Sequence, residues 1–568
     1  MKPQSILRIR VLSGIILAFA LLLIVRLYFL QIVSNDVFSE KADRQYTQSV
    51  ATSFDRGTIY FTNKDGSETT AATLKTGFTI ALNPTKITDA EGTYTKLNAL
   101  VPLDHDDFIA RATKKNDPYE EVAKKVDPDV ADKINALKLP GVSTYKDRWR
   151  YYPQNDLAAK TVGFVGYKGN TLAGRYGLES FYDDVLSRGG DDVYVNFFAE
   201  MFSNIKDSVS HDSNKEGDIV TTIEPTVQAT LDKELAAVNA QYSSKTTGGI
   251  IINPKTGEIY AIGAVPGFNL NSFQNEKDAS VFSNQMVENV YEMGSIIKPL
   301  TMAAGLDAGV VTANTTYNDT GCLTLNQSTI CNYDKRARGI TTMQTVLNES
   351  LNVGVSFVTG KLGNQRFTDY FKKYGLGQKT GIDLPNEAQD LIANLDSPRD
   401  LEHATASFGQ GIALTPIATV RALSVLANGG YLITPHIVKE IDYKVGLPKK
   451  IQPEKGPQVI KPETSHEISR MLVNVVDQAL LEGTVKQAHY TIAAKTGTAQ
   501  IASPNGGYYS DRYLHSFMGY FPAYDPEFLI FLYTYDPHGV EYASHTLTQP
   551  FIDITKFLLN YYQVPPDR

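Results

Sequence analysis

The sequence predicts an α+β protein with an N-terminal transmembrane helix, an elongated mixed α/β pedestal domain and a C-terminal domain with an antiparallel sheet. Three observations support this prediction. Residues 11–33 form one apolar segment, residues 34–225 mix short helical and strand-like patterns, and residues 226–562 contain helical stretches between strand-like ones. We assign residues 1–10 to a cytoplasmic tail and residues 563–568 to a C-terminal tail.

The composition is that of a folded protein with more than one domain. The chain has 568 residues, of which 42% are hydrophobic and 20% are charged. The formal net charge is −8, so we expect no nucleic-acid partner. The only cysteines are Cys322 and Cys331, and no His/Cys cluster has metal-ligand spacing, so no metal site is predicted.

The apolar segment 11–33 is long enough to cross a bilayer as one helix. Lys2, Arg8 and Arg10 precede it without any acidic residue, which predicts a cytoplasmic N-terminus and an extracytoplasmic remainder. A cleaved signal peptide is the alternative. We favour a retained anchor because no convincing A-x-A cleavage site follows the apolar run. The predicted location is therefore the plasma membrane, with a single pass.

Residues 34–225 show no constellation of titratable groups, so we interpret them as a structural platform. Gly57, after Asp55 and Arg56, indicates a turn that leads into a strand. Between residues 84 and 140, charged residues with spaced Leu, Ile and Val predict short exposed helices.

The elements of the C-terminal domain follow from hydrophobic periodicity. A helix is expected over 226–240, and two apolar runs around a turn predict a β-hairpin over 249–261. Further helices are expected at 301–308, 341–362, 416–428 and 465–482, and strands at 491–501, 515–521 and 528–535. Together these elements predict an antiparallel sheet flanked by helices.

The two cysteines flank a short run in a domain that we expect to be extracytoplasmic. A local disulfide between Cys322 and Cys331 suits that compartment, whereas two reduced, inert thiols are the alternative. Sequence does not give the geometry of a disulfide, so both interpretations stay open.

A serine followed by a lysine at position i+3 is the first candidate for catalysis. If Ser295 opens a helix, Lys298 lies on the same face, beside the Ser295 hydroxyl. A lysine activates a hydroxyl as a nucleophile only if burial or nearby positive charge lowers the lysine pKa. The simpler interpretation is an amphipathic turn with a capping serine.

Two further motifs follow in the order that penicillin-interacting serine enzymes use, which is S-x-x-K, S-x-N and K-T-G. The second motif is Ser350 with Asn352, and the third begins at Lys495, after an apolar strand-like run. A glycine in such a strand lets the backbone lie close to a substrate. We therefore predict one cleft with catalytic residues Ser295, Lys298, Ser350, Asn352 and Lys495, and substrate-binding residues Thr496, Gly497 and Thr498.

With these motifs the chain resembles the class B, or monofunctional, penicillin-binding proteins over nearly its whole length. Shorter stretches at 26–32, 55–59, 408–411 and 516–522 add to the resemblance. The length and the N-terminal pattern look closest to the cell-division branch, and the elongation branch is the near alternative. The chain departs from the family at 541–544, where relatives often have a Gly-Gly turn before Ala-Ala-Pro-Val-Phe, so this loop stays open.

The resemblance implies a serine β-lactamase-like fold for the C-terminal domain and D,D-transpeptidation of stem peptides that end in D-Ala-D-Ala. Ser295 would attack the penultimate carbonyl, and an amine from a neighbouring stem would take the acyl group. β-Lactams would acylate Ser295 as substrate mimics. Neutral Lys298 would take the Ser295 proton, and Ser350 would relay protons. No cofactor is needed.

The remaining roles concern binding of the peptide. Asn352 would hold the substrate backbone, and Lys495 with Thr496 or Thr498 would bind the terminal carboxylate. The backbone N–H groups of Ser295 and Thr498 would form an oxyanion hole. The implied partners are the membrane, a SEDS-family glycan polymerase that docks on the anchor and on residues 34–225, and other divisome proteins.

Three alternatives stay open at this stage. A D,D-carboxypeptidase or a β-lactamase-like hydrolase would use water as acceptor, and Glu387 lies where serine β-lactamases place a deacylating glutamate. Its simpler interpretation is a loop carboxylate. An inactive division scaffold or a β-lactam sensor would bind without turnover. A sensor is disfavoured because only about ten residues precede the anchor.

Overall fold

The computed structural model describes residues 19, 54–115, 117–169, 171–188, 216–453 and 456–568. The predicted transmembrane segment 11–33 lies outside the described residues except for one position. Among the described residues, no helix combines the length and the apolar character that a membrane span needs.

The described residues form two compact units. The first unit contains the described residues within 1–56, 74–150 and 188–211, and the second contains those within 57–73, 151–187 and 212–568. Every residue predicted to take part in catalysis or substrate binding belongs to the second unit.

The first unit is a small sheet packed against helices. The later part of β3 (Glu68–Leu82) pairs antiparallel with β4 (Glu120–Val126) and also pairs with β5 (Val142–Tyr151). Its helices are α3 (Ala90–Asn98), α4 (His105–Ala112) and α5 (Pro128–Ala136), so the short helices predicted here are present. Asp89 and Asp104 cap the first two of these helices through their carboxylates. The core consists of Ile80, Leu82, Leu97, Phe108, Ala112, Val126 and Ile134.

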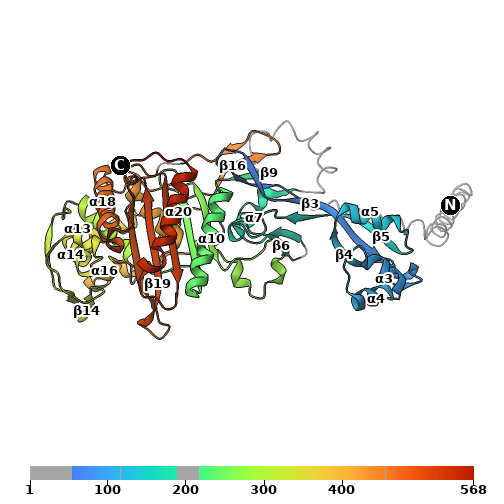
Figure 1. Cartoon of the computed structure of the whole chain (residues 1–568), viewed down its shortest axis with the longest axis horizontal. Helices are drawn as coiled ribbons and strands as arrows, with labels where there is room; N and C mark the ends of the chain where they lie inside the picture. Colours follow the sequence, from blue (N-terminus) through green and yellow to red (C-terminus); the bar gives the residue numbers. More distant parts are fainter. Residues whose placement is uncertain (1–18, 20–53, 116, 170, 189–215, 454–455) are drawn as a thin grey trace, which may run out of the picture. The chain divides into compact units, whose positions relative to one another are not determined.

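The centre of the second unit is a five-stranded antiparallel sheet in the order β11-β10-β20-β19-β18 (Figure 1). Its strands are β10 (Thr246–Ile252), β11 (Ile259–Val265), β18 (Ala493–Ala502), β19 (Tyr508–Phe521) and β20 (Phe528–Tyr535). The predicted hairpin and the three predicted strands are therefore all present, as an antiparallel sheet.

Both faces of this sheet are covered, because successive side chains of a strand point to opposite faces. Ile251 packs with helices α10 (Pro225–Tyr242) and α20 (Thr548–Tyr561). Ile250 and Ile252 belong to a larger apolar cluster on the other face, with helices α12 (Lys298–Asp307), α14 (Asn352–Leu362), α17 (Pro416–Ala427) and α18 (Pro462–Asn474). The sheet thus lies between two helical layers (Figure 1).

The remaining elements of the second unit are short. Strand β2 (Ile59–Thr62) runs parallel to β9 (Gly217–Thr221), which pairs antiparallel with β16 (Val438–Tyr443). The other strands are β6 (Val165–Lys168), β7 (Thr171–Gly174), β12 (Thr316–Asp319), β13 (Cys322–Leu325), β14 (Ser328–Cys331), β15 (Gly339–Thr342) and β17 (Lys449–Lys450). The other helices are α6 (Ala159–Val162), α7 (Gly177–Phe181), α8 (Asp183–Leu186), α11 (Gln285–Glu288), α13 (Met343–Asn348), α15 (Asn364–Lys373), α16 (Asp400–Ala406) and α19 (Ala543–Thr546).

Two predicted helices are wrong in their extent. The stretch 341–362 is not one helix, because α13 ends at Asn348 and α14 begins at Asn352. Between them Ser350 has a φ of 55°, a left-handed conformation that interrupts a right-handed helix. The stretch 465–482 is α-helical to Asn474 as α18 and continues as a π helix over Val475–Ala479, and left-handed residues at 481–482 interrupt it.

Candidate active site

The turn that carries Ser295 is a short 3₁₀ helix, Gly294–Ile297, which continues into α12. Pro299 has no N–H and cannot bond the Ser295 carbonyl in the α-helical manner. The Lys298 N–H bonds that carbonyl instead, which gives the tighter 3₁₀ turn. Ser295 is half-buried. Lys298, three residues later, is fully buried.

Two lysine amines meet at one serine hydroxyl. Lys298 Nζ donates to Ser350 Oγ at 3.0 Å and also to the Ser350 carbonyl. Lys495 Nζ donates to the same Oγ at 3.1 Å and to the Thr496 carbonyl at 3.0 Å. The left-handed backbone at Ser350 matters here, since it turns both the carbonyl and the hydroxyl of one residue toward Lys298. The structure therefore joins one residue from each of the three motifs.

Both lysines are buried, and burial lowers the pKa of each. Lys298 has 0% and Lys495 has 2% of its surface exposed. Burial, and secondarily the charge of Lys495, lowers the pKa of Lys298 well below its ordinary value. Burial lowers the pKa of Lys495 to about 7. In the described part of the chain neither amine forms an ion pair with a carboxylate, so no opposite charge offsets the cost of burying theirs.

The strand with the third motif lies directly against the Ser295 turn. A Cβ added to Gly497 would lie 2.8 Å from the Met293 carbonyl oxygen and 2.3 Å from Ser516 Oγ. A Cβ added to Gly294 would lie 3.0 Å from the Thr498 carbonyl oxygen. Two glycines therefore allow the backbones of β18 and of the turn to approach closely. This contact brings the Ser295 turn to the strand that supplies Lys495.

The Ser295 hydroxyl makes no hydrogen bond to any described residue, and neither lysine amine donates to it. Catalytic hydrogen bonds are often absent before a substrate binds and form in the complex. Lys298, the predicted proton acceptor, is bonded to Ser350 instead.

Two threonines that we predict to bind substrate lie in β18. Thr496 and Thr498 are both half-buried and flank the buried Gly497. Thr498 Oγ1 accepts a hydrogen bond from the Ala543 N–H at 3.1 Å. Residues 541–544, where the loop could not be predicted, therefore lead into α19 and support the end of this motif.

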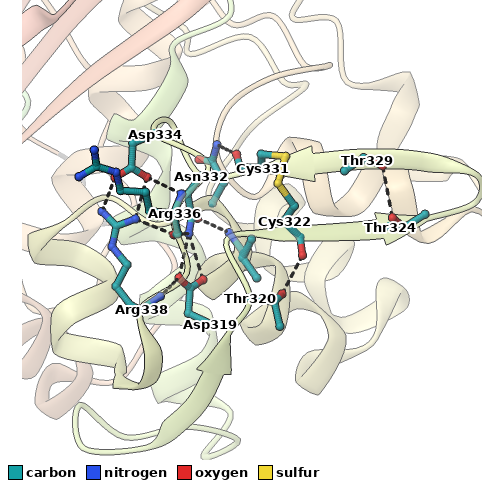
Figure 2. Close-up of a disulfide and its surroundings, with 12 residues drawn as sticks. Asp319, Thr320, Cys322, Thr324, Thr329, Cys331, Asn332, Asp334, Arg336 and Arg338 are labelled. Atoms are coloured by element: carbon teal, nitrogen blue, oxygen red, sulfur yellow. Dashed lines mark hydrogen bonds and ion pairs between the residues drawn. A yellow bond between two sulfur atoms is a disulfide. The ribbon is translucent and has the colours of Figure 1, made fainter.

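Asn352 stands apart from the group of two lysines and Ser350. Its Nδ2 donates to the Cys331 carbonyl at 2.8 Å, while no donor among the described residues reaches its Oδ1. Cys331 forms a disulfide with Cys322, which settles the question that the sequence left open (Figure 2). The structure thus links the second motif to a cystine-containing hairpin.

Three supporting residues, Ser516, Glu292 and Tyr508, were not predicted as site residues from the sequence. Ser516 Oγ donates to the Met293 carbonyl at 2.7 Å and so ties β19 to the Ser295 turn. Glu292 Oε1 accepts from the Gly411 N–H at 3.0 Å and from the Tyr508 hydroxyl at 3.1 Å. Burial raises the pKa of Glu292. Ser516 could have been identified from the sequence, because it is a hydroxyl residue within an apolar strand.

Glu387, the candidate deacylating residue, and His515 of β19 both have structural roles. Glu387 accepts hydrogen bonds from the backbone N–H groups of Thr380 and Gly381, which fits a carboxylate that fastens its own loop. The buried His515 contacts Thr546 Oγ1 and the Glu541 carbonyl, and burial lowers its pKa to about 4. His515 is therefore a packing residue of β19.

Comparison with known proteins identifies two domain families in this chain. The model of the penicillin-binding protein dimerisation domain matches residues 52–222, and that of the penicillin binding protein transpeptidase domain matches residues 247–556. Stage V sporulation protein D of Bacillus subtilis is 30% identical over 539 residues, which cover 93% of this chain and 81% of that protein. Peptidoglycan D,D-transpeptidase FtsI of Escherichia coli is 28% identical over 573 residues, with 99% and 92% covered.

A solved structure has a similar fold. The crystal structure of penicillin binding protein 2X from Streptococcus thermophilus is similar with a TM-score of 0.72 and 18% identity, covering 90% of this chain and 81% of that chain. The chain belongs to the class B penicillin-binding proteins, with a transpeptidase domain that follows a dimerisation domain.

Proposed function

We propose that this protein cross-links peptidoglycan by serine acyl transfer outside the membrane. The Ser295 Oγ attacks the penultimate carbonyl of a D-Ala-D-Ala stem peptide, and the terminal D-Ala leaves as its amine takes a proton. An amine of a second stem then attacks the acyl-enzyme and frees Ser295. The observation that carries this proposal is the shared Ser350 hydroxyl between two buried lysines, beside the Ser295 turn.

In this mechanism the two lysines have different roles: Lys298 accepts a proton, and Lys495 binds a negative charge. Lys298, whose neutral form burial favours, accepts the Ser295 proton. Ser350 bonds both amines, so it can pass a proton between them and toward the leaving amine. Lys495 in its charged form attracts the terminal carboxylate of the substrate, with Thr496 or Thr498 as hydroxyl partners.

Stabilisation of the oxyanion falls to the backbone. The Ser295 N–H lies in the first turn of a helix, where N–H groups lack partners within the helix. Together with the Thr498 N–H on the adjacent strand it would form the oxyanion hole, and each such donor contributes about 2.7–4 kcal/mol. Asn352 Oδ1, which has no donor from the described protein, is available to a substrate N–H.

The acceptor decides between a transpeptidase and a D,D-carboxypeptidase or β-lactamase-like hydrolase. The loop-fastening bonds of Glu387 favour the transpeptidase, because a carboxylate held by two backbone N–H groups is less available to activate water.

The test is a stem-peptide thioester mixed with an excess of a D-amino acid. We expect acyl transfer to the D-amino acid to outpace hydrolysis, and the Ser295→Ala variant to yield neither product. Hydrolysis alone, unaffected by the amine, would identify a hydrolase.

The cellular role is proposed to be septal synthesis during division. This rests on the names of relatives such as FtsI and Stage V sporulation protein D, and on the resemblance of the N-terminal pattern. Depletion should produce filaments, whereas rounded cells would favour elongation. Failure of Ser295→Ala to complement the depletion would separate an enzyme from an inactive scaffold.

We also propose that residues 11–33 anchor the protein in the membrane and that a SEDS-family polymerase docks on this anchor and on residues 34–225. The apolar run and its basic N-terminal flank support the anchor. Membrane fractionation of the full chain and of a variant lacking 1–33 tests it. Co-purification of a polymerase that survives loss of both regions would contradict the docking.

A further inference from the structure

The last two residues of the cystine hairpin, residues 322–332, contact the second motif, Ser350 to Asn352, and the residue after it. Strands β13 and β14 pair only with each other within the described sheets, and Cys322 lies directly opposite Cys331. A two-stranded hairpin is marginally stable on its own. The disulfide therefore closes the hairpin at the end where the chain passes on to Asn332 (Figure 2).

Two neighbouring residues at that end bond the start of α14. The Cys331 carbonyl accepts from Asn352 Nδ2 at 2.8 Å, and Asn332 Oδ1 accepts from the Val353 N–H at 3.1 Å. The N-cap residue of α14, Leu351, provides no side-chain cap. Asn332 therefore supplies the missing cap from a different segment of the chain.

The Asn332 amide is itself fixed in one orientation. It is 2% exposed, and its Nδ2 donates to both carboxylate oxygens of Asp319 at 3.0 Å each. A carboxylate accepts only, so the NH₂ group must face Asp319 and Oδ1 must face Val353. Asp319 also accepts from the Arg338 N–H at 2.9 Å, and this network is visible in Figure 2.

A second connection joins the same network to Ser350. The Arg338 guanidinium bonds both carboxylate oxygens of Asp334, at 2.7 and 2.9 Å. It also donates to Glu349 at 2.8 Å, and Glu349 is the residue before Ser350. The hairpin network thus contacts the S-x-N motif on both sides of its serine.

We propose that Asn332 is a positioning residue for the transpeptidase reaction, and that the Cys322–Cys331 disulfide holds it and the Cys331 carbonyl in place. The proposal rests on the function proposed above. By fixing Nδ2 of Asn352 on the Cys331 carbonyl, the hairpin leaves Oδ1 as the acceptor for a substrate N–H. Loss of the disulfide or of the Asn332 amide releases Asn352 and slows acylation of Ser295, although neither group touches the reacting atoms.

The first test is a double-mutant cycle on the full chain, with the rate of acylation by a fluorescent penicillin as readout. Asn332→Ala should slow acylation by about tenfold, the effect of one lost hydrogen bond to a buried group. In an Asn352→Ala background, Asn332→Ala should have little further effect on the acylation rate. Asn332 acts on the substrate through Asn352, and that side chain is already removed. A merely structural role would lower the rate equally in both backgrounds, and that result would overturn the proposal.

A matched control lies in the same hairpin. Thr324 and Thr329 pair across the strands at 3.3 Å, at the exposed end of the hairpin (Figure 2). Thr324→Val should acylate at the wild-type rate. If it slows acylation as much as Asn332→Ala does, general damage to the hairpin is the cause and the proposal fails.

The second test acts on the disulfide of the wild-type protein, with Asn352→Ala as the comparison. Reduction of the wild-type protein should slow acylation and reoxidation should restore it, while Asn352→Ala should respond to neither treatment. Unchanged or faster acylation of the reduced protein would overturn the proposal. A wild-type protein that penicillin does not acylate in either state would instead overturn the proposed function itself.

Discussion

At the scale of single residues, the site depends on the environment of two lysines. An exposed lysine is charged at neutral pH and cannot accept a proton, but burial without a carboxylate partner favours the neutral form. Lys298 and Lys495 are both buried, and both bond Ser350 Oγ. The hydroxyl thus lies where a proton can move between the two amines.

The Ser350 hydroxyl can be removed without disturbing its backbone. Ser350 has a positive φ, which glycine adopts at no steric cost. Ser350→Gly should therefore fold normally and lose about 10²–10⁴-fold in acylation rate, the usual contribution of a proton-transfer group. Thermal melting with penicillin acylation kinetics checks both parts. Wild-type acylation kinetics in this variant would rule out the relay.

The pKa of Lys495 predicts a pH dependence. Burial lowers this pKa to about 7, so Lys495 in the free enzyme loses its charge as pH rises through that value. The second-order acylation rate constant for a penicillin should fall on the alkaline side of about pH 7, because attraction for its carboxylate is lost. A penicillin methyl ester, which has no carboxylate, should lack this fall. Identical profiles for acid and ester would remove Lys495 from carboxylate binding.

Sequence reasoning at this scale could identify residue types but not their partners. The three motifs are short local patterns, so Ser295, Ser350 and Lys495 could be selected as candidates. The bond from Asn352 to Cys331 could not be predicted, because it depends on how a hairpin 21 positions away packs. The disulfide was undecided for the same reason.

At the scale of elements, the Ser295 turn and β18 pack backbone against backbone. Sequence periodicity predicted the strands and most helices, since their apolar faces are regular. It missed the break between α13 and α14, because no Gly or Pro marks it. The left-handed residue is a serine, held there by tertiary bonds to Lys298.

This close packing predicts the effect of one added methyl group. In Gly497→Ala the new Cβ would approach Ser516 Oγ and the Met293 carbonyl closer than atoms allow. We expect the free energy of unfolding to fall by about 1–3 kcal/mol and acylation to be largely lost. Denaturant unfolding and penicillin labelling check this.

Gly360 provides the control for that change. It lies within α14, and a Cβ added there would meet nothing within 4 Å. Gly360→Ala should leave acylation intact and stabilise the protein by about 1 kcal/mol, the difference in helix propensity. Equal destabilisation by both substitutions would contradict the close packing of β18 on the turn.

At the scale of the whole molecule, segments distant in the sequence form one core. Ile59 of β2, Leu178 of α7 and Ile219 of β9 are fully buried in the same cluster as the residues around Ser295. Hydrophobic patterning could not predict this shared core, because the sequence of a buried strand does not specify which segments pack against it. The boundary between residues 225 and 226 therefore stays a prediction.

A fragment comparison tests how the core is assembled. A chain of residues 226–562 lacks β2, β9 and α7, so we expect it to be less stable than a chain of residues 54–568 and to bind penicillin poorly. Denaturant unfolding of both chains checks the stability difference. Equal stability and labelling would show that the C-terminal domain folds without the earlier segments.

The central claim is that Ser295 is the nucleophile of a site completed by Lys298, Ser350 and Lys495. The most direct measurement is mass spectrometry of the full chain after incubation with a penicillin, followed by peptide mapping. The account predicts one adduct, on the peptide that contains Ser295, and no adduct in Ser295→Ala. An adduct on another residue, or one that persists in Ser295→Ala, would contradict it.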